Sequence, residues 1–145
     1  MTPTRATKRI VTAAVAILLA ITLSGCMTTG QEAVASYLNS DRRSHGLRSL
    51  PTSESLNRKA QAWADHLARS GSLSHSRLSS GVSGCWRRLA ENVGYGSSAR
   101  AVQTAYMKSS GHRANVLNSV WTHVGVGYAK RGSRVYTVQV FMQAC

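Results

Sequence analysis

The chain has 145 residues, with 18 Lys and Arg against 5 Asp and Glu, and a formal net charge of +13. This length suits a single domain. The charge argues against cationic partners and favours anionic ones, such as acidic lipid head groups, wall polymers or nucleic acid. Nucleic acid ranks last, because the basic residues are scattered and no basic run is interleaved with aromatic residues.

The first residues predict an export signal. Arg5, Lys8 and Arg9 form a positive stretch, and an almost entirely apolar run of 14 residues follows from Ile10 to Leu23. That run fits the apolar region of a signal peptide and is short for a membrane-spanning helix, which needs about 20 residues. We therefore expect residues 1–25 to direct export and to be removed.

The apolar run ends in Leu23-Ser24-Gly25-Cys26, which is typical of a bacterial lipobox, cleaved before a cysteine that carries diacylglycerol. The alternatives are an ordinary signal peptide or an uncleaved anchor with an incidental cysteine. Two acyl chains suffice for stable anchoring, at about 0.8 kcal/mol per buried methylene. We predict lipidation at Cys26, a tether over residues 26–30, and a monomeric domain over residues 31–145 on the outer face of the cell membrane or in the cell envelope.

Cleavage at that point changes the charge and the cysteine count. Three of the 18 basic residues precede Cys26, so 15 remain against 5 acids, a net charge of about +10. Two cysteines remain, Cys85 and Cys145. Because an exported chain meets an oxidising compartment, this even pair predicts a disulfide. The alternative is two buried thiols.

Apolar spacing and turn residues predict the elements in chain order. A first helix is expected over Gln31–His45, and a second from Ser53 to the stop signal Gly71. A short strand over Ala90–Gly96 precedes a third helix, capped by Ser97 or Ser98 and ended by Gly111. A short helix over His112–Asn118 follows. Two alternating runs, Val124–Tyr128 and Tyr136–Met142, form a hairpin through Lys130–Ser133. Helices followed by a hairpin indicate an α+β fold.

One carboxylate stands out as a candidate for chemistry. Glu91 lies in an otherwise apolar, glycine-rich strand, where a buried acid needs a partner. His75 and His112 follow the ends of elements and are the candidate partners. One carboxylate and two imidazoles could hold a divalent metal such as zinc, or could line a hydrogen-bonded cleft.

Six segments in order resemble the CAP superfamily, which covers cysteine-rich secretory proteins, antigen 5 and plant pathogenesis-related proteins, and above all its bacterial, SCP-like extracellular members. The match runs from about Gln31 to Phe141. The segments are Leu38-Asn39 with Arg42 and Gly46-Leu47; Leu56 to Ala68; Leu73-Ser74-His75-Ser76; Glu91-Asn92-Val93-Gly94; Ser110 to Leu117; and Val124 to Tyr128.

The resemblance implies a three-layer α-β-α sandwich with a central antiparallel sheet. It also implies a cleft of two histidines, His75 and His112, and two acids, the first being Glu91. The second acid should fall in the helix before Gly111-His112, but residues 98–110 contain neither Asp nor Glu, and Gln103 is the nearest polar substitute. This departure weakens hydrolysis more than metal binding, because acid–base chemistry needs a titratable group.

Neighbouring polar and aromatic residues have alternative roles. Asn92 and Asn115 belong to the matched motifs and are expected to satisfy local backbone groups more than to act on a ligand. The serines beside the two histidines, at positions 74, 76 and 110, are expected to be polar loop residues, because a Ser–His nucleophile needs a third, orienting group. Trp63 is expected in the core, whereas Trp86 and Trp121 could be core residues or line an apolar groove.

Three functions follow from these residues. The favoured one is a binding module for an envelope lipid or another anionic or apolar ligand, with His75, Glu91, Asn92, Gln103 and His112 as its ligand-binding residues. Resemblance supports this, because lipid and sterol binding occur in the family. The alternatives are a metal-assisted hydrolase that uses His75, Glu91 and His112 with a metal-bound water, and a structural extracellular domain.

Overall fold

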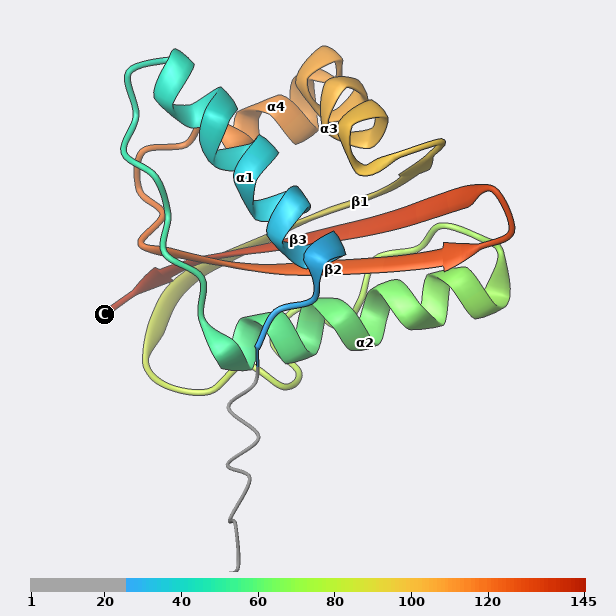
Figure 1. Cartoon of the computed structure of the whole chain (residues 1–145). Coiled ribbons are helices and arrows are strands. Elements are labelled where there is room, and N and C mark those ends of the chain that lie inside the picture. The colour runs from blue at the N-terminus through green and yellow to red at the C-terminus, as the bar shows by residue number, and fades with distance from the viewer. Residues whose placement is uncertain (1–25) are drawn as a thin grey trace, which may run out of the picture.

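The computed structural model describes residues 26–145, so the expected signal segment lies outside the described residues. Four helices and three strands follow one another in this part of the chain (Figure 1). They are α1 (Thr29–Ser44), α2 (Glu54–Ser70), β1 (Trp86–Gly96), α3 (Ala99–Lys108), α4 (Ser110–Val116), β2 (His123–Arg131) and β3 (Arg134–Ala144).

The three strands form one antiparallel sheet in the order β1-β3-β2. Helix α2 covers one face of this sheet, and α1, α3 and α4 lie over the other (Figure 1). The expected α+β fold, a three-layer α-β-α sandwich with a central antiparallel sheet, is thereby confirmed. Strand β1 forms one edge of the sheet, which places its residues at the boundary between the two helical layers.

Each face of the sheet has its own apolar core. Between α2 and the sheet lie Leu56, Ala60 and Leu67 with Val138 and Val140. Because β3 is buried on both faces, Thr137 and Gln139 are buried as well as the valines that alternate with them. The core on the other face consists of residues from α1, α3, α4, the hairpin and the loops after α1 and α4, namely Val34, Ala35, Leu38, Leu50, Ala99, Val116, Trp121, Val124, Val126 and Phe141.

Two glycines in β2 let α2 pack directly on the strand backbone. A Cβ added at Gly125 would lie 2.2 Å from the carbonyl carbon of Leu56, and one at Gly127 would lie 2.1 Å from the carbonyl oxygen of Ala60. Glycine in a strand often marks such a close approach of another backbone. These two residues therefore set the distance between α2 and the sheet.

The boundaries of helices and strands differ from expectation at several places, of which three are explained by local contacts. Helix α1 begins at Thr29, because Thr28 and Gln31 form a capping box, so the expected tether is shortened by two residues. Strand β1 begins at Trp86 because it pairs with β3 as far as Ala144. The third helix was expected to end at Gly111. It ends at Lys108, because the backbone of Ser109 is extended, and Gly111 lies within α4.

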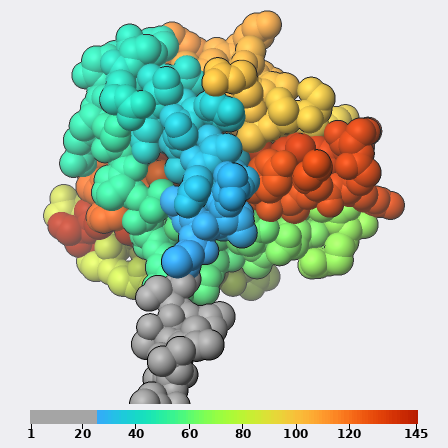
Figure 2. All heavy atoms as spheres, in the orientation of Figure 1, coloured from blue at the N-terminus to red at the C-terminus, as the bar shows by residue number. Residues whose placement is uncertain are grey.

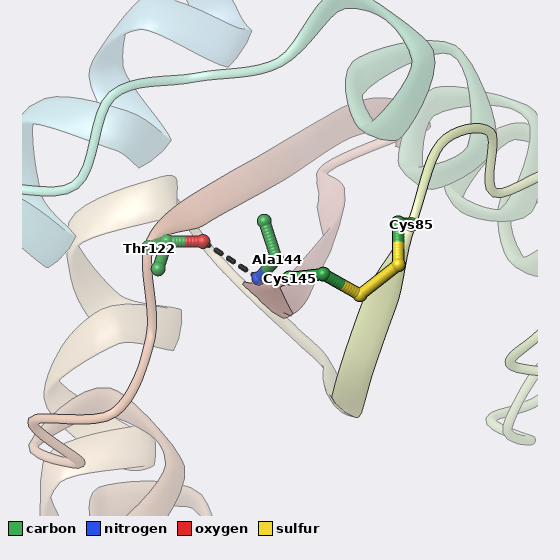
Figure 3. The surroundings of a disulfide bond; sticks show 4 residues. All are labelled: Cys85, Thr122, Ala144 and Cys145. Atoms are coloured by element: carbon green, nitrogen blue, oxygen red, sulfur yellow. Dashed lines mark hydrogen bonds between the residues drawn. A yellow bond between two sulfur atoms is a disulfide. The ribbon is translucent and has the colours of Figure 1, made fainter.

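Cys85 and Cys145 form a disulfide with an S–S distance of 2.00 Å, which confirms the predicted pair. Figure 3 shows it beside Thr122, whose Oγ1 accepts a hydrogen bond from the backbone N–H of Ala144 at 2.9 Å. The bond and the strand pairing fix the end of the chain to the start of β1.

Both cores, the sheet and the disulfide lie within residues 26–145, which therefore form a self-contained folding unit. Within this unit, no helix has the length and apolar character to cross a membrane.

Candidate functional site

The Glu91 carboxylate is buried in β1 and fully engaged in hydrogen bonds. Its Oε1 accepts from the backbone N–H of Ser76 at 2.9 Å and lies 2.8 Å from His75 Nδ1, and its Oε2 accepts from Ser76 Oγ at 2.6 Å. The Glu91 side chain is 2% exposed, whereas the His75 side chain is 63% exposed. The expected partner for the buried acid is therefore present, and Glu91 holds the ring of His75 with Nδ1 as the donor.

The loop that carries His75 is fastened to α2. Trp63 Nε1 donates to the carbonyl of Ser74 at 2.8 Å. Lys59 Nζ donates to the carbonyls of Arg77 at 2.9 Å and Ser80 at 2.8 Å. Burial lowers the pKa of Lys59, and the negative charge of Glu91 opposes that shift. Helix α2 thus holds the loop in the position at which His75 meets Glu91.

His112 reaches the same edge from α4, on the other face of the sheet. Its Nδ1 lies 2.9 Å from Ser109 Oγ, and its ring packs against Tyr106 with the ring centres 5.0 Å apart. The Asn92 side chain donates to the His112 carbonyl at 3.2 Å. Burial lowers the pKa of His112, and the positive charge of His75 lowers it further.

Two consecutive residues of β1 therefore organise the site. Side chains alternate between the faces of a strand, so Glu91 points to the α2 layer and Asn92 to the layer of α3 and α4. Each holds one histidine. Among the described residues, neither His75 Nε2 nor His112 Nε2 has a hydrogen-bond partner, so both nitrogens are available to a ligand.

A buried amide network extends from Asn92 into the protein. Asn92 Nδ2 donates to Gln139 Oε1 at 3.1 Å, and Gln139 Nε2 donates to Gln103 Oε1 at 2.7 Å. Gln103 Nε2 then donates to Asp41 Oδ2 at 2.7 Å. Asn115 Nδ2 donates to Asn92 Oδ1 at 2.9 Å. Asn92 and Gln103 are both buried, so they can position the site from within the protein.

Sequence reasoning missed the two network members Asp41 and Gln139. Asp41 is in α1, far from the expected motif, and a glutamine in an alternating strand is expected to face solvent. The one sequence signal was that Val135 and Phe141, which alternate with the main apolar set of β3, are apolar too, which favours burial on both faces. Asp41 brings a carboxylate to Gln103, the nearest polar substitute for the acid that the resemblance implies in this helix.

The donor set does not fit a three-ligand metal site. Both oxygens of Glu91 already accept hydrogen bonds, and residues 26–145 contain no group of three or more His, Cys, Asp or Glu placed to hold a metal ion. Two imidazoles remain, which is one ligand fewer than the catalytic zinc sites of proteins use. A metal-bound water is therefore not part of the mechanism that we derive from this site.

The serines and tryptophans near the site have distinct roles. Ser76 donates to Glu91, while the hydroxyl beside His112 Nδ1 belongs to Ser109. Trp121 is a core residue, 4% exposed, and Trp86 is 38% exposed at the start of β1. Trp63 is half-buried and stacks on His66, with the ring centres 4.4 Å apart.

The sequence profile of the Cysteine-rich secretory protein family, abbreviated CAP, matches residues 35–143. The chain belongs to this family. The matched range contains every residue of the site described above. The family assignment agrees with the resemblance in the sequence motifs.

Among curated proteins, the chain is 33% identical over 120 residues to the uncharacterized protein YkwD of Bacillus subtilis. That alignment covers 75% of this chain and 46% of YkwD, so this chain spans about half the length of that CAP relative.

Solved structures share the fold. An outer surface protein of Borrelia burgdorferi aligns with a TM-score of 0.69 at 16% identity, over 79% of this chain and 92% of that one. An extracellular protein of Bacillus anthracis with an SCP domain aligns with a TM-score of 0.68 at 22% identity, over 83% of this chain and 45% of that one.

Proposed function

We propose that this CAP domain is an exported, lipid-anchored binding module that holds an amphipathic envelope lipid at the β1 edge of its sheet. The observation that carries the proposal is the position of the exposed large apolar side chains in the described residues. Leu73, Trp86 and Tyr95 are 43%, 38% and 47% exposed, and all three lie on β1 or on the loop before it.

These exposed apolar side chains along one edge of the sheet support a binding role. Trp86 and Tyr95 lie near the two ends of β1, so a ligand that contacts both would extend along the edge strand, as an acyl chain can. At the same edge, His75 and His112 offer their free Nε2 atoms to a polar group. A ligand with a polar head and an apolar body matches both features, and the net charge of about +10 favours an acidic head group.

Binding is a better match to this geometry than hydrolysis. General acid–base chemistry needs a group that can transfer a proton near the operating pH. The one carboxylate at the site is buried and accepts three hydrogen bonds, so its role is to orient His75. A purely structural domain would not require exposed apolar residues on β1.

Export and anchoring are supported by separate observations. The Cys85–Cys145 disulfide is typical of chains that fold in an oxidising compartment. The names of two structural neighbours describe an outer surface protein and an extracellular protein. Cys26 is exposed and unpaired at the start of the described chain, where an enzyme that attaches lipid can reach it. Mass spectrometry of the full chain and of Cys26→Ser, produced in a bacterial host, tests this modification.

Vesicle cosedimentation tests the ligand site. The probe is residues 26–145 carrying Cys26→Ser, with vesicles of phosphatidylglycerol or phosphatidylcholine. We expect two double variants, Leu73→Ser/Tyr95→Ser and His75→Ala/His112→Ala, each to weaken binding to phosphatidylglycerol by about tenfold. The control is His66→Ala, which removes an exposed histidine outside the site and should leave binding unchanged. Binding that is the same in all four proteins would contradict the proposal. Zinc titration of the same proteins checks whether the two histidines bind metal on their own.

A further inference from the structure

The two ends of α1 differ in the charged residues around them. Near Cys26, Glu54 and Asp65 line the same hollow of about 450 Å³ as Cys26 itself. Glu32 lies in the first turn of α1. These are three of the five carboxylates of the chain, and the others, Asp41 and Glu91, accept hydrogen bonds inside the protein. The end of the domain that carries Cys26 therefore has most of the carboxylates, and we call it the acidic end, although Arg58 lines the same hollow and pairs with Glu54.

The opposite end of α1 is basic. Arg43, His45, Arg48 and Arg113 are all exposed there, and we call them the α1-end cluster. Arg113 Nη2 donates to His45 Nε2 at 3.1 Å, which joins α4 to the end of α1. Figure 1 shows α1 running from the segment after Cys26 to the layer of α3 and α4, and Figure 2 shows its first residues in blue at the bottom of the view and its last in teal at the top.

A fully buried cation lies behind this cluster. Arg42 is 0% exposed, and its guanidinium donates only to the backbone carbonyls of Arg48, Val116 and Asn118. Its Nη2 has no partner among the described residues. Burial lowers the pKa of Arg42, and the positive charge of Arg48 adds to the shift. The protein thus places a buried positive charge beside exposed ones without neutralising it.

No ion pair offsets this charge in the described residues, although Asp41 lines the same hollow as Arg43. In residues 26–145 the side-chain ion pairs are Arg58–Glu54 and His75–Glu91, and neither involves the cluster. Asp41 is the carboxylate nearest in sequence, and its Oδ2 accepts from Gln103. Positive groups held together without counter-charges create a potential that concentrates anions.

A second group of basic residues lies at the β2–β3 turn and is held by different contacts. Arg131 donates to the carbonyl of Arg69 at the end of α2, and Arg134 stacks on the ring of Tyr95 at 4.3 Å. Asp65 lines the same hollow as Arg131 and Lys130. This turn therefore provides a matched control of similar charge.

From these placements we infer that the α1-end cluster is a docking surface for an anionic wall polymer, a chain with repeated phosphodiester or carboxylate groups. Its guanidinium groups are spread over the end of α1, the loop after it and α4, which suits a chain of repeated charges better than one enclosed ion. Arginine is the residue that pairs best with phosphate and carboxylate oxygens.

Distance from the anchor favours a polymer over the membrane. Helix α1 has 16 residues and is about 24 Å long, which is two to three times the Debye length of about 8–10 Å at physiological ionic strength. A domain anchored through Cys26 keeps its acidic end at the lipid head groups and its cluster beyond the reach of their field. This step rests on the lipid anchoring in the proposed function, whereas the charge on the cluster does not.

Binding of a synthetic glycerol-phosphate oligomer to residues 26–145 with Cys26→Ser tests the surface. We expect the triple variant Arg43→Gln/Arg48→Gln/Arg113→Gln to bind about tenfold more weakly, and the slope of log affinity against log salt to fall by about two to three. The control Arg69→Gln/Lys130→Gln/Arg134→Gln removes the same charge and should change the affinity less than about threefold.

Three outcomes would overturn the assignment. The two triple variants could lose the same oligomer affinity, or neither could lose any. The cluster variant could also lose more affinity for phosphatidylglycerol vesicles than for the oligomer. Because Arg48 and Arg113 each make an internal hydrogen bond, thermal unfolding checks that the triple variant folds, and Arg43→Gln alone provides a milder variant. The protein in this assay carries no lipid, so failure of anchoring at Cys26 leaves the result unaffected.

Discussion

Glu91 and Asn92 are adjacent in β1, point to opposite faces of the sheet, and each holds one of the two histidines of the site. The two contacts are different in kind. Glu91 contacts the ring of His75, whereas Asn92 binds the backbone carbonyl of His112. The edge strand thus fixes a ring from one layer and a backbone position from the other, which brings together two segments that are far apart in sequence.

Replacing Glu91 should cost far more stability than replacing its partner. Glu91→Ala leaves the backbone N–H and hydroxyl of Ser76 without their acceptor, so we expect a loss of about 2–3 kcal/mol in the free energy of unfolding. His75→Ala should cost about 0–1 kcal/mol, because the ring is largely exposed. Urea unfolding of both variants checks this. Equal losses would mean that the imidazole, and not Ser76, is the main partner of the carboxylate.

An acid at position 103 should destabilise the protein. Gln103→Glu places a second carboxylate against Asp41 in a buried network, so we expect the free energy of unfolding to fall by about 2–4 kcal/mol at neutral pH. The fall should be smaller when the pH is low enough to protonate one of the two carboxylates. The double variant Gln103→Glu/Asp41→Asn should recover most of the loss, because an amide again faces a carboxylate. A single variant as stable as the wild type would show that the site accepts the family's second acid here.

The packing of α2 should depend on the strand glycines. Gly125→Ala drives a methyl group into the backbone of Leu56, and we expect a loss of about 3 kcal/mol or more, or failure to fold. Gly111→Ala is the control, because a Cβ there meets nothing within 4 Å. It should change stability by no more than about 1 kcal/mol. Circular dichroism during thermal unfolding measures both, and similar losses would contradict a role for close packing.

Periodicity was enough to predict most of the fold. The α2 stripe with Leu56, Ala60 and Leu67, the hairpin and the Cys85–Cys145 pair follow from spacing and from the parity of the cysteines, because each is a local or countable feature. The boundary at Ser109 was missed because a glycine two residues later is the stronger stop signal, although it serves inside α4.

The candidate site was only partly predictable for a related reason. Glu91 and the two histidines stand out because their residue types are expensive to bury or unusual in their setting. The amide chain through Gln139 and Gln103 to Asp41 joins β3, α3 and α1, and its members resemble ordinary surface residues in sequence. Only the three-dimensional packing of those elements brings the amides together. Gln103 therefore has a structural partner that motif comparison does not identify.

Acidification should weaken the fold through His112. Its pKa in the folded protein is lowered by burial and by His75, so between that value and the unfolded value of about 6.5 the unfolded chain binds more protons. Stability should therefore be complete above about pH 6.5 and fall as the pH drops toward the folded pKa.

Urea unfolding of wild type and His112→Gln between about pH 7.5 and pH 5.5 tests this expectation. The variant should lose less stability than wild type over that interval, while the exposed control His66→Gln should follow wild type. If His112→Gln and wild type lose the same stability, His112 is not the group that couples protonation to unfolding. An NMR titration of the imidazole that gave a pKa above the ordinary value would reverse the sign of the expected dependence and contradict the burial of the ring against Tyr106 as its cause.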